Sequence, residues 1–199
     1  LKFFWEEEFL KANTYEYPDF DKFNTFPKLL KHRSEIMPDE VALRNKDLGI
    51  WNEITWDEYN KIVSELSIGL KSIGFKKGDV LALIGDNKPE WVFFEIACHA
   101  NGGMSLGVYR DTLDDEVGYL VKSAKVKFAY AEDQEQVDKL INVQKKLKTK
   151  IKVIYDDPRG LEKLKNPNVI HMRDLASEGK KQLDKNNKLY ENLINKVSG

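Results

Sequence analysis

Residues 79–109 read DVLALIGDNKPEWVFFEIACHANGGMSLGVY, and this stretch decides the fold. An apolar run at 79–86 leads into a helix-like segment at 89–101, which is followed by a second apolar run at 104–109. Pro89 suits a first helical turn, where its missing N–H would have no partner in any case. Strand, helix and strand in this order predict a βαβ unit with parallel strands and a right-handed crossover.

The same alternation continues toward the carboxyl end of the chain. Apolar, β-rich runs recur at 126–132 and 151–157, and helix-like segments fill 113–124 and 134–147. The runs are continuously apolar, as expected of parallel strands that are covered on both faces. The sequence therefore predicts an α/β fold with a mostly parallel sheet and flanking helices.

The part upstream of residue 79 is organised differently. Two short β-rich runs within 41–55 predict a β-hairpin, and Thr55 with Glu58 has the spacing of a capping box at the start of a helix. The first residues are rich in aromatic and acidic side chains and lack long periodicity. We expect an amino-terminal helix and arm over 1–24 and an α/β unit over 25–199.

The composition describes a globular protein with enough apolar residues for a core, since 41% of its 199 residues are hydrophobic. A formal net charge of −1 argues against nucleic acid as a partner, because phosphate binding needs a basic excess. The one cysteine, Cys98, excludes an internal disulfide and has no metal-ligand spacing around it, so no metal site is expected. These features suit a reducing cytoplasm.

Neither a membrane span nor a signal peptide is indicated. No run approaches eighteen apolar residues, and the opening LKFFWEEEFL lacks a methionine and a basic-then-apolar order, so we expect that Leu1 is not the native start. Five lysines within 145–152 predict a solvated helix end; the alternative is contact with a membrane surface, which would place the protein at the inner membrane face.

The segment 89–101 is apolar almost all the way round. Eight of the ten residues from Trp91 to Ala100 are apolar, whereas a surface helix needs only one apolar face. This predicts either a large fold or a covering segment that is absent from this chain.

Motifs that carry chemistry are sparse. The sequence holds no GxxxxGK[ST] loop, no GxGxxG and no GxSxG. Glu95 and His99 lie four residues apart on the apolar helix, which suits either a pair beside a substrate pocket or a mutually satisfied polar spot. Tyr109 and Arg110 follow a strand, where α/β sheets bind ligands; the alternative is an ordinary surface turn.

The order of five segments resembles a known family. ITWDEY, KKGDVLALIGDNKPEW, GVYRDTLDDEVGYL, AEDQEQVDKL and YDDPRG occur in sequence, and together the resemblance covers roughly residues 25–199. They look like the amino-terminal part of an adenylate-forming, AMP-binding acyl-CoA synthetase, and most resemble bacterial long-chain fatty acid–CoA ligases.

The resemblance implies a parent enzyme that uses ATP, Mg²⁺ and CoA to convert a fatty acid through acyl-AMP into acyl-CoA. In that family a loop of the type TSGTTGxPKG holds the ATP phosphates, and this chain stops at Gly199, before such a loop. The resemblance therefore implies a fragment that is inactive by itself, with no catalytic residue and no bound cofactor. It also implies that the remainder of the polypeptide covers the apolar helix 89–101.

One cofactor contact and several alternatives follow from the resemblance. In some related ligases a basic residue at the position of Lys88 approaches the phosphates of CoA, and a helix amino terminus suits an anion; the alternative is a solvated lysine. The rival hypotheses are a ligase for an aryl or medium-chain acid and a non-catalytic α/β binding module. A homodimer and a peripheral membrane contact are further expectations.

Overall fold

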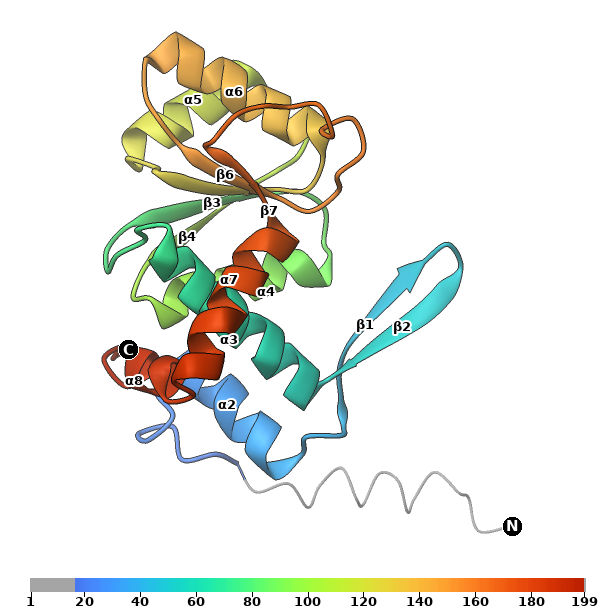
Figure 1. Cartoon of the computed structure of the whole chain (residues 1–199), viewed down its shortest axis with the longest axis vertical. Helices are drawn as coiled ribbons and strands as arrows, with labels where there is room; N and C mark the ends of the chain where they lie inside the picture. Colours follow the sequence, from blue (N-terminus) through green and yellow to red (C-terminus); the bar gives the residue numbers. More distant parts are fainter. Residues whose placement is uncertain (1–16, 199) are drawn as a thin grey trace.

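The computed structural model describes residues 17–198, which form a five-stranded parallel sheet with helices on both faces and a separate β-hairpin (Figure 1). The sheet has the order β4-β3-β5-β6-β7. The strands are β3 (Val80–Ile84), β4 (Met104–Val108), β5 (Phe128–Ala131), β6 (Lys152–Tyr155) and β7 (Val169–His171). The hairpin pairs β1 (Val41–Asp47) with β2 (Ile50–Thr55). The predicted α/β class is confirmed.

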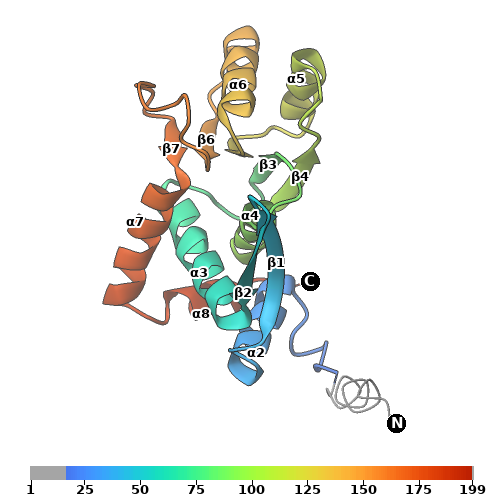
Figure 2. The ribbon, with the colours of Figure 1, turned by 90° about the vertical axis from the view of Figure 1, so that its right-hand side faces the viewer.

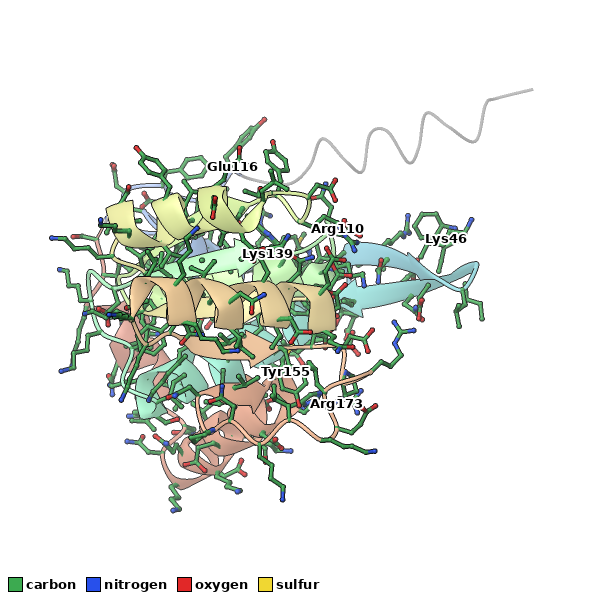
Figure 3. The ribbon with its side chains drawn as sticks, turned by 90° about the horizontal axis from the view of Figure 1, so that it is seen from above. Lys46, Arg110, Glu116, Lys139, Tyr155 and Arg173 are labelled. Atoms are coloured by element: carbon green, nitrogen blue, oxygen red, sulfur yellow. The ribbon has the colours of Figure 1, made fainter. Side chains whose placement is uncertain are left out.

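The helices form two layers. One face of the sheet carries α5 (Asp114–Ser123) and α6 (Gln134–Leu147), which lie side by side in Figure 3. The helices on the other side are α2 (Phe26–Ile36), α3 (Trp56–Ser72), α4 (Pro89–Ala100), α7 (Met172–Lys185) and α8 (Leu189–Ile194). Figure 2 shows the hairpin projecting from this second layer.

Local sequence signals explain where several elements begin and turn. The Thr55 hydroxyl accepts a hydrogen bond from the Glu58 N–H at 3.2 Å, and the Glu58 carboxylate accepts one from the Thr55 N–H at 2.9 Å, so the predicted capping box is confirmed. The hairpin turns through Leu48 and Gly49, both with positive φ, as a two-residue turn of this hand requires.

Two glycines let α3 and α7 approach closely. A Cβ on Gly179 of α7 would overlap the Glu65 carbonyl oxygen and lie 2.9 Å from the backbone nitrogen of Gly69 in α3. A Cβ on Gly69 would in turn lie 2.5 Å from the carbonyl oxygen of Leu175. The two helix backbones therefore touch with no side chain between them.

The apolar surface of α4 is covered largely from within the chain, so only a small remaining face is left for a longer polypeptide to cover. Phe93 and Phe94 are buried, and only Trp91 and Val92 among the apolar residues of α4 are half-exposed. The cover comes from α3 and from α2, a helix that the sequence reading did not assign. Cys98 is buried on this helix, which raises the pKa of its thiol to about 12.

The predicted amino-terminal arm lies mostly outside the described residues, which begin at Tyr17. Within the described part of the arm, Phe23 stacks on His32 of α2 with 4.0 Å between ring centroids. Across residues 17–198, every helix is too short or too polar to span a bilayer.

Candidate functional site

The strand order makes two neighbouring loops diverge at the carboxyl ends of the strands. The loop after β3 leads to α4 on one face, whereas the loop after β5, the neighbouring strand, leads to α6 on the other face. Open α/β sheets bind ligands where neighbouring loops diverge in this way, beyond the carboxyl ends of the strands. We call the carboxyl ends of β3 and β5 the switch point.

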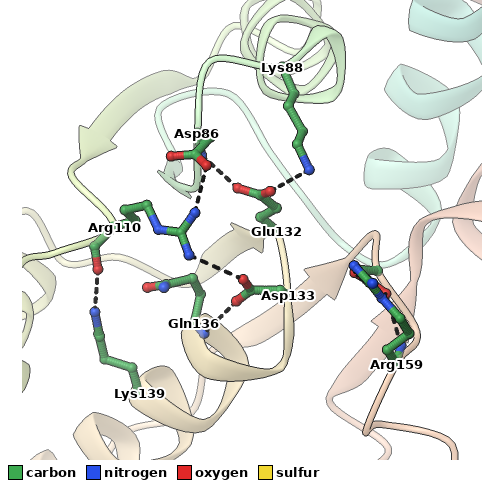
Figure 4. Close-up of polar contacts among 9 residues, drawn as sticks. Asp86, Lys88, Arg110, Glu132, Asp133, Gln136, Lys139 and Arg159 are labelled. Atoms are coloured by element: carbon green, nitrogen blue, oxygen red, sulfur yellow. Dashed lines mark hydrogen bonds and ion pairs between the residues drawn. The ribbon is translucent and has the colours of Figure 1, made fainter. Parts of the chain in front are cut away.

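Glu132 occupies the centre of the switch point (Figure 4). One carboxylate oxygen lies 2.5 Å from Lys88 Nζ, and the other accepts a hydrogen bond from the Asp86 N–H at 2.6 Å. Glu132 is only 6% exposed, so its carboxylate is largely shielded from bulk water, whereas the Lys88 side chain is 41% exposed. Gly85 makes room for it, because a Cβ there would lie 2.8 Å from the Glu132 Cβ.

Arg110 pairs with carboxylates on the other side of the switch point. Its guanidinium contacts the Asp86 carboxylate at 2.6 Å and the Asp133 carboxylate at 3.6 Å, and its carbonyl accepts a hydrogen bond from Lys139 Nζ at 2.5 Å. Asp133 also caps α6 by accepting the Gln136 N–H. Arg110 thus ties together the segments that follow β3, β4 and β5 (Figure 4).

Two further carboxylates surround the Lys88 side chain. Burial raises the pKa of Glu90, at the start of α4, and the charge of Asp156, after β6, adds to this shift. Burial likewise raises the pKa of Asp156. For Lys88, burial lowers the pKa, but the hydrogen bond and charge of Glu132 outweigh this, so the pKa is raised and the ammonium is retained.

The switch point is therefore a set of paired charges suited to binding a polar ligand. A ligand phosphate could contact donors of Lys88 and Arg110 that are left free beside these carboxylates, because both side chains are partly exposed. Among residues 17–198, no three histidine, cysteine or acidic side chains are grouped so that they could hold a metal ion.

Comparisons with known proteins identify the family. The sequence matches the AMP-binding enzyme family over residues 30–189, which is more than half of the chain. The chain belongs to this family. Long-chain-fatty-acid–CoA ligase ACSBG1 of Bos taurus is 25% identical over 142 residues, covering 71% of this chain and 19% of that protein. ACSBG2 of Rattus norvegicus is 24% identical over 119 residues, covering 60% of this chain and 18% of that protein.

Several solved structures share the fold. A putative long-chain-fatty-acid CoA ligase from Rhodopseudomonas palustris has a TM-score of 0.64 at 21% identity, over 77% of this chain and 36% of that chain. A luciferase-like enzyme from Zophobas morio has a TM-score of 0.66 at 16% identity, over 81% and 35%. The chain spans about a fifth of the length of the curated relatives it matches.

The predicted site residues fall into two groups. Lys88 and Arg110 meet at the switch point, and Tyr109, next to Arg110, is 89% exposed. Glu95 and His99 lie farther along α4, and His99 is about 16 Å from Lys88 along the helix axis.

Glu95 and His99 are joined through a third residue, Ser105. His99 Nε2 lies 3.1 Å from the Ser105 hydroxyl, and that hydroxyl donates to the Glu95 carboxylate at 3.3 Å. The single hydroxyl proton points to Glu95, so the imidazole acts as the donor to Ser105. The three side chains thus satisfy one another's hydrogen-bonding groups, and because His99 also lines a cavity with Phe26 and Lys77, both sequence interpretations of the pair stay open.

Sequence reasoning missed Glu132, Asp86 and Asp133. The signal was present, because acidic residues follow the apolar runs of β3, β5 and β6 within two positions. What the sequence lacks is the strand order, which sets Glu132 beside Asp86 and Lys88 although 44 or more positions separate them in the chain.

Proposed function

We propose that this chain is the amino-terminal part of an ATP-dependent acid–thiol ligase that converts a long-chain fatty acid through acyl-AMP into its CoA thioester. The observation that carries the proposal is the family match over residues 30–189, and the relatives named long-chain-fatty-acid–CoA ligase support the substrate class. ATP, Mg²⁺ and CoA are the cofactors of the proposed whole enzyme.

The 199-residue chain by itself serves in this proposal as a scaffold. Its sequence carries no glycine-rich phosphate loop to stabilise the charge that develops on the α-phosphate and pyrophosphate. We expect no fatty-acid-dependent pyrophosphate release from the purified chain, and release above background would refute this part. Reading the encoding DNA past Gly199 tests the rest: an open frame entering a Thr/Ser/Gly-rich loop supports the ligase, and a stop codon favours a binding module.

Lys88 is the proposed contact for a CoA phosphate. It is the N-cap residue of α4, whose first turn has no side-chain cap, and its side chain is 41% exposed. The residues fit an anion, because the ammonium keeps donors free beside Glu132. We propose that four further residues line the substrate pocket. Tyr109 and Arg110 lie near Lys88, and Glu95 and His99 lie farther along α4.

A titration with CoA tests the Lys88 contact. No stably bound cofactor is expected on the fragment, so CoA is added in large excess to detect a weak contact. Backbone amide signals around α4 should then shift in the wild-type chain and stay unchanged in Lys88→Gln. Lys127→Gln is the matched control. Lys127 also pairs with a carboxylate, Asp79 at 2.7 Å, but it precedes β5 and so lies at the amino-terminal ends of the strands, away from the switch point. If the amide signals of the two variants respond equally to CoA, Lys88 is not part of the CoA site.

The alternative substrate class and the cellular location rest on other observations. An anthranilate CoA ligase shares the fold, with a TM-score of 0.64 at 14% identity, so a parent acting on an aryl or medium-chain acid is the second candidate. For location we propose the cytoplasm, with lysines of 145–152 as a peripheral contact with the inner membrane face. Salt-sensitive binding to anionic vesicles tests that contact.

A further inference from the structure

Lysines gather at the amino-terminal ends of the sheet strands. The loops that lead into β3, β5 and β6 hold six lysines and one acid, Asp79. These lysines are Lys76, Lys77, Lys125, Lys127, Lys148 and Lys150. Because the three strands are neighbours and parallel, their preceding loops meet at the same end of the sheet. We call this surface the basic end; the sequence reveals only the part of it within 145–152.

The basic end is hollowed. Lys76, Lys127, Lys150 and Lys152 line one hollow of about 380 Å³. Among the described residues that line it, Asp79 is the only acid, and it pairs with Lys127 at 2.7 Å. The hollow therefore carries a net positive charge, which suits an anion.

The hollow is separate from the place where the described chain ends. Val197 and Ser198 line a different cavity, which shares no lining residue with the hollow. The positive charge is also a property of the lysines themselves, whichever neighbouring segments are present.

Two of the lysines take a backbone conformation that glycine adopts more easily. Lys125 follows α5 with φ +53°, and Lys148 follows α6 with φ +51°. Glycine is the usual residue at such a left-handed position after a helix, because a Cβ there crowds the backbone. The last turns of both helices already carry other lysines that complement the helix dipoles. The strained positions therefore favour a role for the two charges at the surface.

The opposite ends of the strands are acidic. The loops after β3, β5 and β6 carry acids at the switch point and beside it: Asp86, Glu132, Asp133, Asp156 and Asp157. The formal net charge of −1 thus conceals a separation of charge along the strands. Such a separation would orient the protein on an anionic surface, with the basic end toward that surface and the switch point away from it.

We propose that the basic end binds the phosphate groups of an anionic lipid surface. Lys127 is paired, and Lys152 donates to the Ile73 carbonyl at 2.6 Å, so the charge that faces solvent comes mainly from exposed lysines. These are Lys76, Lys77, Lys125, Lys148 and Lys150. The surface refines the membrane contact proposed above, on which it rests, and it is independent of the ligase chemistry.

The side chains of the basic end favour lipid over other anionic partners. All its basic residues are lysines, which are mobile point charges, whereas a site for one fixed phosphate gains from the bidentate geometry of arginine. Single-stranded nucleic acid would need an exposed aromatic ring on which to stack, and Phe75 and Phe128 are buried. Basic clusters without such features bind anionic headgroups by summed, salt-sensitive attraction.

Vesicle binding tests the proposal. In low-salt buffer the wild-type chain should bind vesicles of phosphatidylcholine with phosphatidylserine and should not bind vesicles of phosphatidylcholine alone. Soluble glycerol phosphate, at the same phosphate concentration as the lipid, should not compete, because the contact sums several weak charges across a surface. Competition would indicate a site for a free phosphate ester and would overturn the lipid assignment.

A double variant outside 145–152 tests which lysines make the contact. Lys76→Gln combined with Lys125→Gly should weaken binding to the anionic vesicles about 30-fold, since two charges near the surface are lost. Its urea midpoint should not fall, because glycine adopts the left-handed conformation without steric conflict. Lost binding with an unchanged midpoint would exclude unfolding as the cause.

The matched control removes two exposed lysines from the end of α7. Lys181→Gln combined with Lys185→Gln makes the same change in net charge. The end of α7 lies beside the start of α3, whereas the hollow lies beside the end of α3. Binding of this control should remain close to that of the wild type.

Three results would overturn the proposal. Equal weakening in the two double variants would show that net charge alone governs binding. Wild-type binding by Lys76→Gln/Lys125→Gly would leave 145–152 as the contact, so the proposed location would stand while the basic end would not. Failure of the wild type to bind anionic vesicles at low salt would overturn both.

Discussion

Substituting Gly179 by alanine should destabilise the protein although alanine favours helices. The new Cβ would overlap the Glu65 carbonyl oxygen and lie 2.8 Å from its carbonyl carbon, and both are backbone atoms that cannot rotate away. Separating α7 from α3 costs about 3 kcal/mol, toward the upper end for overpacked cores. Helix propensity returns about 1 kcal/mol, which leaves a net loss of about 2 kcal/mol in the free energy of unfolding.

Gly118→Ala provides the matched control, because it makes the same chemical change in a helix that has room for it. A Cβ on Gly118 of α5 would meet only Val143 Cγ1, at 3.9 Å. Propensity should then dominate and stabilise the protein by roughly 0.5–1 kcal/mol. In urea unfolding followed by circular dichroism, with a slope of about 2 kcal/mol per M, the midpoint should fall by about 1 M for Gly179→Ala and rise by roughly 0.3–0.5 M for Gly118→Ala. Midpoint shifts of the same sign in both variants would refute the reasoning.

Three further predictions follow from single side chains. Thr55→Ala removes the cap of α3 and should cost about 1 kcal/mol in urea unfolding, whereas an unchanged midpoint would show that the capping box contributes nothing. Cys98 should react with a thiol reagent at pH 8 only as fast as the protein unfolds, because the thiol is buried and its pKa is about 12; rapid labelling of the native protein would contradict its enclosure. Asp156→Asn should stabilise the protein at pH 7. Burial raises the folded-state pKa of Asp156, so its charge costs stability above that pKa, and the advantage of asparagine should shrink as the pH falls through it. An advantage that stays constant with pH would contradict this origin.

Most of the fold was predictable because its signals are local. The buried runs at β3 and β5 and the capping box at Thr55 each appear within a few residues of sequence. Helix α2 was missed because its eleven residues include only five apolar side chains, of which Phe26 and Ile36 are exposed. That omission also made the uncovered part of α4 look larger than it is, since α2 supplies part of its cover.

The candidate site was predictable only in part, because its pairings cross between strands. A residue after a strand is a reasonable ligand-binding candidate, and this rule found Lys88 and Arg110. The partner of each depends on which strands are neighbours, so Glu132 and Asp86 could not be paired from sequence alone. The same limit applies to His99 and Glu95, which are four residues apart on one helix but are bridged by Ser105 from β4.

The position of the uncovered apolar surface changes what remains to be explained. Sequence patterning located it on α4, yet Phe93 and Phe94 are enclosed by this chain, while Met104 at the amino end of β4 is 57% exposed. On α4 itself, the apolar surface that the sequence assigned to a missing partner is therefore reduced to Trp91 and Val92, which are half-exposed.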